Sequence, residues 1–273
     1  MILKFLVVLV LTVFSKVAPA AVKYDFEDEK TILTDHDDQL SSTDAELGEL
    51  FEGDILLSST QREAIQQAKS SRNVLINIST RWPNSTVVYQ IVEEDFDEQQ
   101  INMIKEGMKD IEKKSCVIFR PKDESTEEHA VTIQGTGRGC YASIGYTTGK
   151  QVYNLGEDCF YHRTVVHEFL HILGFHHMQN TYDRDEYVKI VWENIQPGQE
   201  HNFEKRSDET VTDFGLEYDY ASIMHYGATD FSKNGNPTII PLEENVTIGE
   251  SNELSEIDVK KINIMYNCPD EKY

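Results

Sequence analysis

The chain has 273 residues, of which 39% are hydrophobic and 10% aromatic, enough apolar material for one large packed domain or two small ones. Its formal net charge of −23 argues against partners that are themselves negatively charged. Nucleic acids and anionic membrane surfaces both bind basic faces, so neither is an expected partner.

The N-terminal residues predict a signal peptide over residues 1–20. Lys4 supplies a charged start, an apolar stretch follows, and Ala18-Pro19-Ala20 is a small-residue cleavage site. The apolar stretch is about half as long as the roughly 20 residues that a bilayer span needs, so no membrane anchor is expected. We therefore predict a secreted, extracellular protein.

Secretion makes disulfides plausible, because extracellular compartments are oxidising. The four cysteines can pair in three ways, and their spacing leaves all three open. The chain has no C-x-x-C spacing, so a cysteine zinc site is not expected. Three N-x-S/T motifs, which begin at Asn77, Asn84 and Asn245, are candidate glycosylation sites.

Residues 21–72 differ from the rest of the chain. They are rich in Asp and Glu, contain no cysteine and show little sustained apolar periodicity. Such a segment cannot bury much of a core by itself, so one interpretation is a disordered acidic spacer. The alternative interpretation is an inhibitory propeptide, which the motifs below favour.

From residue 73 onward the pattern is typical of a folded domain with α+β architecture. The predicted strands are 86–92, 116–119, 130–134, 141–146 and 151–155. The predicted helices are 95–113, 162–174 and 255–266. The chain between the last two helices has few regular patterns, which predicts a mostly irregular C-terminal lobe closed by a helix.

The run HEFLHILGFHH has the spacing of a metal-binding helix. His167 and His171 are four residues apart, so both project from one face of the helix. Glu168 lies beside the first ligand, where its carboxylate can hold a water at the metal. Gly174 can adopt a positive φ and end the helix, after which His177 can return as a third ligand. Three histidines and one open position are typical of a catalytic zinc site.

HExxH alone arises by chance, but here it extends to HExxHxxGxxH, the motif of the metzincin metalloproteases. That class also requires a turn with a methionine below the metal, and SIMHY supplies Met224. Ordinary core packing is the alternative role for this methionine. We expect His176 and His225 to orient or pack rather than to bind metal, and His162 has no assigned role.

The chain resembles the astacin family of metzincins from about residue 73 to residue 268. The segments that carry the resemblance are RWP, GCYASIG, HEFLHILGFHH, DRD, SIMHY and YNC. The resemblance implies a two-lobed metzincin-like catalytic domain with a mixed twisted sheet and the zinc-binding helix at the cleft floor. It also implies the disulfides Cys116–Cys268 and Cys140–Cys159.

Two further roles follow from the resemblance. Tyr226 is implied as a possible fifth zinc ligand in the resting enzyme, which swings away to stabilise the oxyanion, so Glu168 and Tyr226 are the candidate catalytic residues. Phe51-Glu52-Gly53-Asp54 is similar to the family's propeptide motif. A carboxylate can take the fourth zinc position, so Asp54 is expected to bind the metal in the zymogen only.

Three positions depart from the family pattern. Met178 stands where a glutamate usually follows the third histidine and meets the new N-terminus. Thr181 stands where arginine is common. Glu250-Ser251 follow an Ile-Gly pair after which many relatives have a basic residue. A preference for acidic substrates is therefore not assumed.

Together these features predict a secreted zinc-dependent endopeptidase that hydrolyses peptide bonds with metal-activated water and binds one Zn²⁺ per chain. The predicted domains are the signal peptide 1–20, the propeptide 21–72 and the peptidase domain 73–273. The expected partners are protein or peptide substrates and a trypsin-like activating protease that cuts after Arg72. The enzyme is expected to be a monomer.

The strand at 151–155 is predicted to align an extended substrate as an added edge strand. Two alternative functions were weighed. A secreted binding protein that kept the fold but lost catalysis would be expected to lack Glu168. A non-protease zinc hydrolase is disfavoured by the methionine turn and by the propeptide motif.

Overall fold

The computed structural model describes residues 50–70, 81–126, 129–207 and 213–269. All of them belong to one compact unit, Asp37–Tyr273. The predicted signal peptide, Asn77 and the predicted cleavage site at Arg72 lie outside the described residues. Within the described ranges, no helix combines the length and the apolar character that crossing a bilayer requires.

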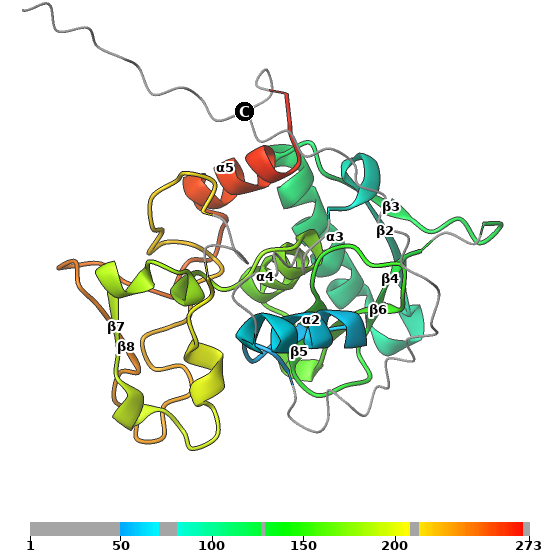
Figure 1. The fold of residues 1–273 in the computed structure, drawn as a ribbon. Helices are drawn as coiled ribbons and strands as arrows, with labels where there is room; N and C mark the ends of the chain where they lie inside the picture. Colours follow the sequence, from blue (N-terminus) through cyan, green and yellow to red (C-terminus); the bar gives the residue numbers. More distant parts are fainter. Residues whose placement is uncertain (1–49, 71–80, 127–128, 208–212, 270–273) are drawn as a thin grey trace, which may run out of the picture. The chain divides into compact units, whose positions relative to one another are not determined.

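A six-stranded sheet dominates the N-terminal half of this unit (Figure 1). Its strands, in spatial order, are β1 (Ile55–Leu56), β5 (Cys140–Ser143), β6 (Gln151–Leu155), β4 (Val131–Gln134), β2 (Thr86–Ile91) and β3 (Ile118–Pro121). Only the β5–β6 pair is antiparallel, and the other neighbours are parallel. The predicted α+β class with a mixed sheet is confirmed.

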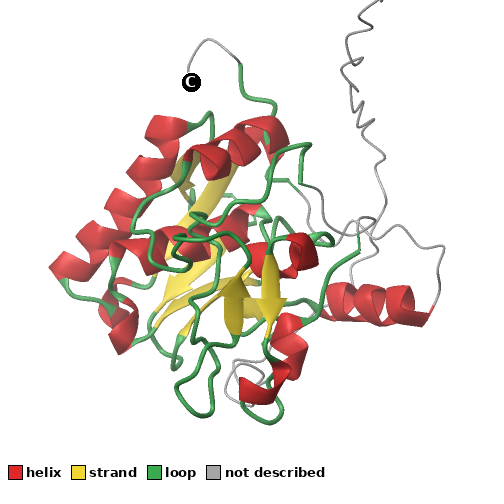
Figure 2. Ribbon diagram, turned by 90° about the vertical axis from the view of Figure 1, so that its left-hand side faces the viewer, coloured by secondary structure: helices red, strands yellow, loops and turns green. Residues whose placement is uncertain are grey.

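Two helices, α3 (Glu98–Lys114) and α4 (His162–Leu173), lie against one face of the sheet and against each other (Figure 2). α3 begins in a capping box, in which the Asp97 side chain accepts from the backbone of Gln100. Gly107 lets the two helices approach closely, since a Cβ there would lie 2.7 Å from the Val165 side chain. The buried faces of both helices and the sheet form the main hydrophobic core.

The C-terminal half contains little regular structure, as predicted. A short antiparallel pair, β7 (Val188–Ile190) and β8 (Ile239–Pro241), was not predicted. Around it, a second hydrophobic cluster includes Phe203 and Tyr226. The chain closes with α5 (Glu256–Met265), which begins in a capping box formed by Ser255 and Asp258.

Seven short 3₁₀ turns connect these elements in the described part of the chain. They are η1 (Pro83–Ser85), η2 (Glu93–Asp95), η3 (Glu157–Cys159), η4 (Met178–Asn180), η5 (Arg184–Glu186), η6 (Trp192–Asn194) and η7 (Glu200–Phe203).

The structure joins Cys116 to Cys268 and Cys140 to Cys159, the two pairings that the family resemblance implies. The first links the end of the chain to the segment between α3 and β3, and the second links β5 to η3.

The acidic segment before residue 73 holds regular structure, so the disordered-spacer interpretation is wrong for residues 50–70. This segment forms β1 and the helix α2 (Ser59–Ser70), drawn in blue in Figure 1. Ile55, Leu56 and Leu57 are buried, at most 4% exposed, against side chains of the sheet half. The segment lacked a core of its own, but it completes one by packing on the domain that follows.

The predicted substrate-aligning strand is a second correction. β6 (Gln151–Leu155) lies between β5 and β4 and is buried along its whole length, so it has no free edge. The β5 strand lies outside it, and β1 pairs with that edge. The sequence pattern identified β6 as a strand, but side-chain alternation does not reveal the order of strands in a sheet.

Candidate metal centre

Four side chains from two distant parts of the chain meet at one point. Asp54, His167, His171 and His177 each offer one ligand atom, and these atoms all lie within 4.8 Å of one another. The Asp54 carboxylate lies 3.3 Å from His167 Nε2, and 3.2 Å from Nε2 of both His171 and His177. The structure thus brings together the three predicted histidine ligands and Asp54.

The helix α4 positions the first two histidines, and its end positions the third. Gly174 terminates α4 with a φ of 107°, a conformation that glycine adopts without strain, and its N–H bonds back to the His171 carbonyl. The chain then reverses, and the His177 ring reaches within 3.2 Å of His167. The predicted turn after the helix is therefore present.

The second ring nitrogen of each histidine has its own partner. His167 Nδ1 lies 2.9 Å from the Ile223 carbonyl, and His171 Nδ1 lies 2.7 Å from the Phe175 carbonyl. His177 Nδ1 lies 3.1 Å from a carboxylate oxygen of Glu52. A proton on each Nδ1 leaves the Nε2 lone pairs facing the shared point.

This donor set fits a zinc ion. Donors around a tetrahedral zinc with bonds of about 2.0–2.1 Å lie about 3.3–3.4 Å apart. The Asp54 carboxylate lies at a similar distance, 3.2–3.3 Å, from the three histidine Nε2 atoms. His171 Nε2 and Asp54 Oδ1 are buried 3.2 Å from each other, and neither has a further hydrogen-bond partner among the described residues. Facing lone pairs repel, so a cation at their centre satisfies all four groups.

Protonation behaviour also indicates a place for positive charge. Burial lowers the pKa of His171 to about 4, against the opposing effect of Asp54, which favours the neutral imidazole that binds metal. Burial also opposes charge on His177, but the carboxylates of Asp54 and Glu52 outweigh it and raise its pKa to about 9. The two carboxylates thus favour a positive charge at His177.

Glu168 lies one residue after the first histidine, as predicted, and is 2% exposed. Burial, followed by the nearby charge of Asp54, raises the pKa of its carboxyl well above the ordinary value. Its Oε2 atom has no hydrogen-bond partner in the described part of the chain. An unpaired, buried carboxyl beside the metal ligands is suited to proton transfer.

Tyr226 lies beside the metal centre, with its ring centroid 4.6 Å from that of His177. Its hydroxyl donates a hydrogen bond to the backbone carbonyl of Glu52. Burial raises the pKa of this phenol well above its ordinary value, so it stays protonated. In this structure the hydroxyl is therefore held by the segment that precedes residue 73.

The methionine turn is fixed by a side chain from α5. The Asp258 carboxylate accepts from the Ser222 hydroxyl at 2.6 Å and from the Ile223 N–H at 2.9 Å. Met224 is 3% exposed, and its carbonyl accepts from Met178 N–H at 3.0 Å. Nothing in the sequence pattern linked α5 to this turn.

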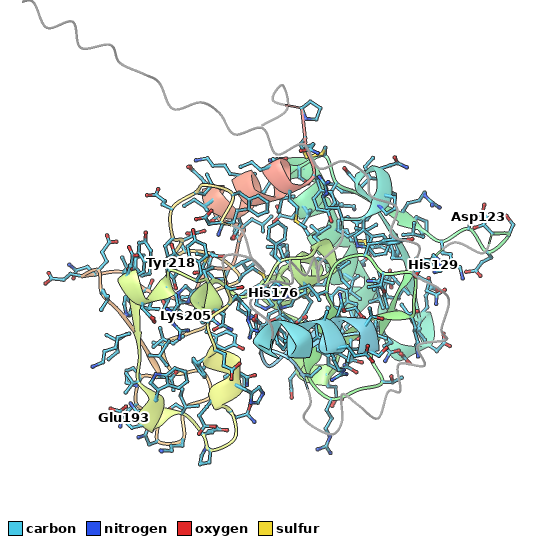
Figure 3. All side chains as sticks on the ribbon, viewed as in Figure 1. Asp123, His129, His176, Glu193, Lys205 and Tyr218 are labelled. Atoms are coloured by element: carbon cyan, nitrogen blue, oxygen red, sulfur yellow. A yellow bond between two sulfur atoms is a disulfide. The ribbon has the colours of Figure 1, made fainter. Side chains whose placement is uncertain are left out.

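The other three histidines of the sequence analysis are not among the four residues that meet at the metal centre. His225 is buried, and its ring lies 2.7 Å from the Tyr218 hydroxyl and 2.8 Å from the Tyr226 carbonyl. His176, labelled in Figure 3, lies 3.7 Å from Glu52. His162 lies 3.5 Å from Asp110.

Two residues near the metal centre were missed by sequence reasoning. Glu52 is fully buried, and its Oε1 lies 2.7 Å from Nε of Arg206. The Arg206 guanidinium lies over the Phe51 ring, 4.2 Å from its centroid. Glu52 belongs to the motif that contains Asp54, which could have drawn attention to it, but no local pattern marks Arg206.

A cleft opens beside the metal centre, with a volume of about 420 Å³. Its lining includes His167, Glu168, Arg163, Tyr226 and Phe231. A cleft next to the metal ligands gives a peptide room to approach Glu168.

The other predicted surface features and departures are placed as follows. Asn84 and Asn245 are exposed. Met178 is buried, and its sulfur lies 3.1 Å from the Lys261 ammonium. The Thr181 hydroxyl donates to the Met178 carbonyl, and Glu250 is exposed.

Comparison with known proteins agrees with this geometry. The model of the peptidase family Astacin matches residues 74–267. Seminal metalloprotease 1 of Drosophila melanogaster is 41% identical over 208 residues, which cover 73% of this chain and 83% of the relative. Zinc metalloproteinase nas-4 of Caenorhabditis elegans is 37% identical over 227 residues, which cover 83% of this chain and 71% of the relative.

A longer match is to zinc metalloproteinase nas-13 of Caenorhabditis elegans, 33% identical over 288 residues. It covers 95% of this chain, but this chain spans only 63% of that relative's length. Among solved structures, the hatching enzyme zinc-protease high choriolytic enzyme 1 from Oryzias latipes is 34% identical, with a TM-score of 0.64. The match covers 70% of this chain and 94% of that one.

The fold and the three-histidine centre are those of a zinc metalloendopeptidase, with zinc as its cofactor and proteins or peptides as its substrates. Since the family model matches well over half of the sequence, the chain belongs to the astacin family.

Proposed function

We propose that the chain is the zymogen of a secreted zinc endopeptidase, with a signal peptide at 1–20, an inhibitory propeptide at 21–72 and a peptidase domain at 73–273. The observation that carries this proposal is the position of Asp54. Its carboxylate lies 3.2–3.3 Å from the three histidine Nε2 atoms, where substrate and water would need to enter. A carboxylate in that position blocks the open coordination site that catalysis requires.

Zinc, when bound by His167, His171 and His177, supplies Lewis-acid polarisation of the attacking water and of the scissile carbonyl. Glu168 accepts the proton of the water and passes it to the leaving amine. Its burial and its raised pKa support this role, because a carboxylate with a raised pKa is a stronger base than an ordinary one.

Tyr226 is proposed to stabilise the oxyanion. The hydroxyl that the Glu52 carbonyl engages here becomes free when the propeptide leaves. In the resting matured enzyme its hydroxyl would be a fifth ligand to bound zinc, and in the reaction it would donate to the developing negative charge. A single donor of this kind is worth about 3 kcal/mol.

The edge of β5 is proposed to align the substrate. β1 now pairs with it, and Ala142 N–H donates to the Asp54 carbonyl at 2.9 Å. Once β1 is gone, the strand Cys140–Ser143 offers the same backbone groups to an extended peptide. The cleft beside Glu168 supports a protein or peptide substrate.

Activation is proposed to follow a cut after Arg72 by a trypsin-like protease. Cleavage makes the contact between Asp54 and the metal centre bimolecular, so the segment loses the effective concentration that the tether gave it. The matured enzyme is proposed to be a monomer, glycosylated at Asn77, Asn84 and Asn245.

The test is Asp54→Ala in the full-length precursor. We expect peptidase activity before any cleavage, because the fourth ligand is gone. Glu63→Ala is the matched control, since Glu63 is an exposed carboxylate on α2 of the same segment and should leave the precursor latent. If the Asp54→Ala precursor stays inactive until it is cut after Arg72, the Asp54 carboxylate is not the switch. The propeptide then inhibits by steric cover of the site.

A further inference from the structure

The three metal-site histidines differ in what fixes their rings. His167 and His171 donate from Nδ1 to backbone carbonyls of the peptidase domain, Ile223 and Phe175. His177 instead meets Glu52, a residue of the propeptide segment, at 3.1 Å. Within the described ranges, Glu52 is the acceptor that the structure gives to this nitrogen. The third ligand therefore relies on a segment that maturation removes.

Glu52 is held firmly for this contact. It is 0% exposed, its Oε1 lies 2.7 Å from Arg206 Nε, and its Oε2 also accepts from the His177 backbone N–H at 3.2 Å. Arg206 is itself packed over the ring of Phe51 and anchored through its backbone N–H to the Asn180 carbonyl at 2.7 Å. A buried carboxylate persists only when it is paired, so these contacts fix Glu52 in one geometry.

The residue after His177 does not offer a replacement carboxylate. It is Met178, whose sulfur contacts the Lys261 ammonium at 3.1 Å and whose backbone N–H bonds to Met224. A partner for the second ring nitrogen orients a histidine ligand and makes it more basic, and its loss typically costs about 10–100-fold in metal affinity.

We propose that Glu52, held in place by Arg206, is a positioning residue for the third metal ligand, His177. The precursor then binds zinc more tightly than the matured enzyme does, and the difference exceeds what the direct ligand Asp54 contributes. The propeptide then acts on the metal centre twice, through one ligand and through the partner of another. This inference rests on the proposed zymogen function.

The experiment measures the zinc dissociation constant of full-length precursors by competition with a chelator. All variants carry Glu168→Ala, which prevents self-digestion, and Asp54→Ala, which removes the direct ligand. Adding Glu52→Leu removes the acceptor and should weaken zinc binding by about 10–100-fold. Adding Glu52→Gln keeps an acceptor oxygen and should weaken it by less than about threefold. Glu63→Leu, on the exposed face of α2, is the matched control and should have no effect.

Glu52→Leu alone leaves the Arg206 cation buried without its partner and could release the segment. The double change Glu52→Leu/Arg206→Leu replaces the ion pair by apolar side chains, and it must show the same loss of affinity. If the zinc dissociation constants of both leucine variants lie within about threefold of that of the Glu168→Ala/Asp54→Ala precursor, the inference is overturned. A precursor with native Asp54 and Glu52 that binds no zinc would instead contradict the proposed function.

Discussion

The two halves of the metal centre are built by different physical means. In the sheet half, residues 81–173, backbone hydrogen bonds and apolar packing place His167 and His171 on one face of α4. In the irregular half, residues 174–207 and 213–253, single side chains hold the backbone: Gln179 accepts from Tyr226 N–H, and Glu52 of the preceding segment accepts from His177 N–H. The first half uses repeating local geometry, and the second uses individual long-range contacts.

Arg184 illustrates the second kind of construction. It is 4% exposed, and one of its terminal nitrogens donates to the carbonyls of Gln179 and Phe203 at 2.9 and 2.8 Å. The Gln179 side chain in turn accepts from Tyr226 N–H at 3.1 Å. One buried cation thus fixes three segments, so a single substitution in this half should cost more than a small change in the helical core.

The largest effect is expected for the helical half of the site. Glu168→Ala in the matured enzyme should reduce kcat by about 10²–10⁴-fold, because the proton acceptor is lost. Zinc content should stay at one ion per chain, since the three histidines remain. Peptide hydrolysis and metal analysis on the same sample decide this. Substantial residual turnover would show that Glu168 is not the proton acceptor.

The second prediction concerns the links between segments. Removing the Cys116–Cys268 disulfide, with a sequence separation of 152, should cost about 4–5 kcal/mol of stability by the chain-entropy argument. Removing Cys140–Cys159, with a separation of 19, should cost about 3 kcal/mol. Denaturant unfolding of the paired Cys→Ala variants measures both. Equal costs would show that loop closure does not dominate.

The third prediction tests the comparison directly. Arg184→Met should destabilise the protein by about 2–4 kcal/mol, because it leaves two buried carbonyls without their donor. Ile104→Val, in the buried face of α3, should cost only about 1 kcal/mol. Urea unfolding of the wild type and both variants measures the two losses in the free energy of unfolding. A larger loss for the isoleucine change would reverse the proposed difference between the halves.

The smallest effect is a pH dependence at the methionine turn. Burial raises the pKa of Asp258, although the Ser222 hydroxyl and the Ile223 N–H oppose this. A carboxyl whose pKa is raised on folding adds stability below its unfolded pKa, and that stability is lost as the pH rises through the folded pKa. The stability of wild type relative to Asp258→Asn should therefore fall as the pH rises above about 4, the ordinary pKa of an unfolded aspartate. Unfolding curves on both sides of this pH check the sign, and a difference that grows with pH would contradict it.

Local geometry explains what could be read from the sequence. The i, i+4 spacing of His167 and His171 defines a shared helix face whatever surrounds it. A glycine at position 174 and a histidine three residues later specify the reversal that completes the ligand set. The strands at 86–91, 131–134 and 151–155 follow from β-branched and alternating residues, so their predicted positions agree closely with the structure.

Short patterns were less informative where the chain lacks periodicity. β7 and β8 are each three residues long and were missed, and β3 begins two residues later than predicted. The helix α2 was missed because its segment was judged on composition, without the surface on which it packs. Helices of this length gain most of their stability from tertiary contacts rather than from intrinsic propensity.

The sequence by itself determined the family, the zinc-binding helix, the three histidine ligands and the candidate base Glu168, since these depend on neighbours a few residues apart. Tertiary structure alone decided which strand is at the sheet edge, how Asp258 fixes the methionine turn, and how Glu52 and Arg206 support His177. Those pairs are far apart along the chain and belong to no repeating pattern. Only the packing of the whole core brings such residues within hydrogen-bonding distance.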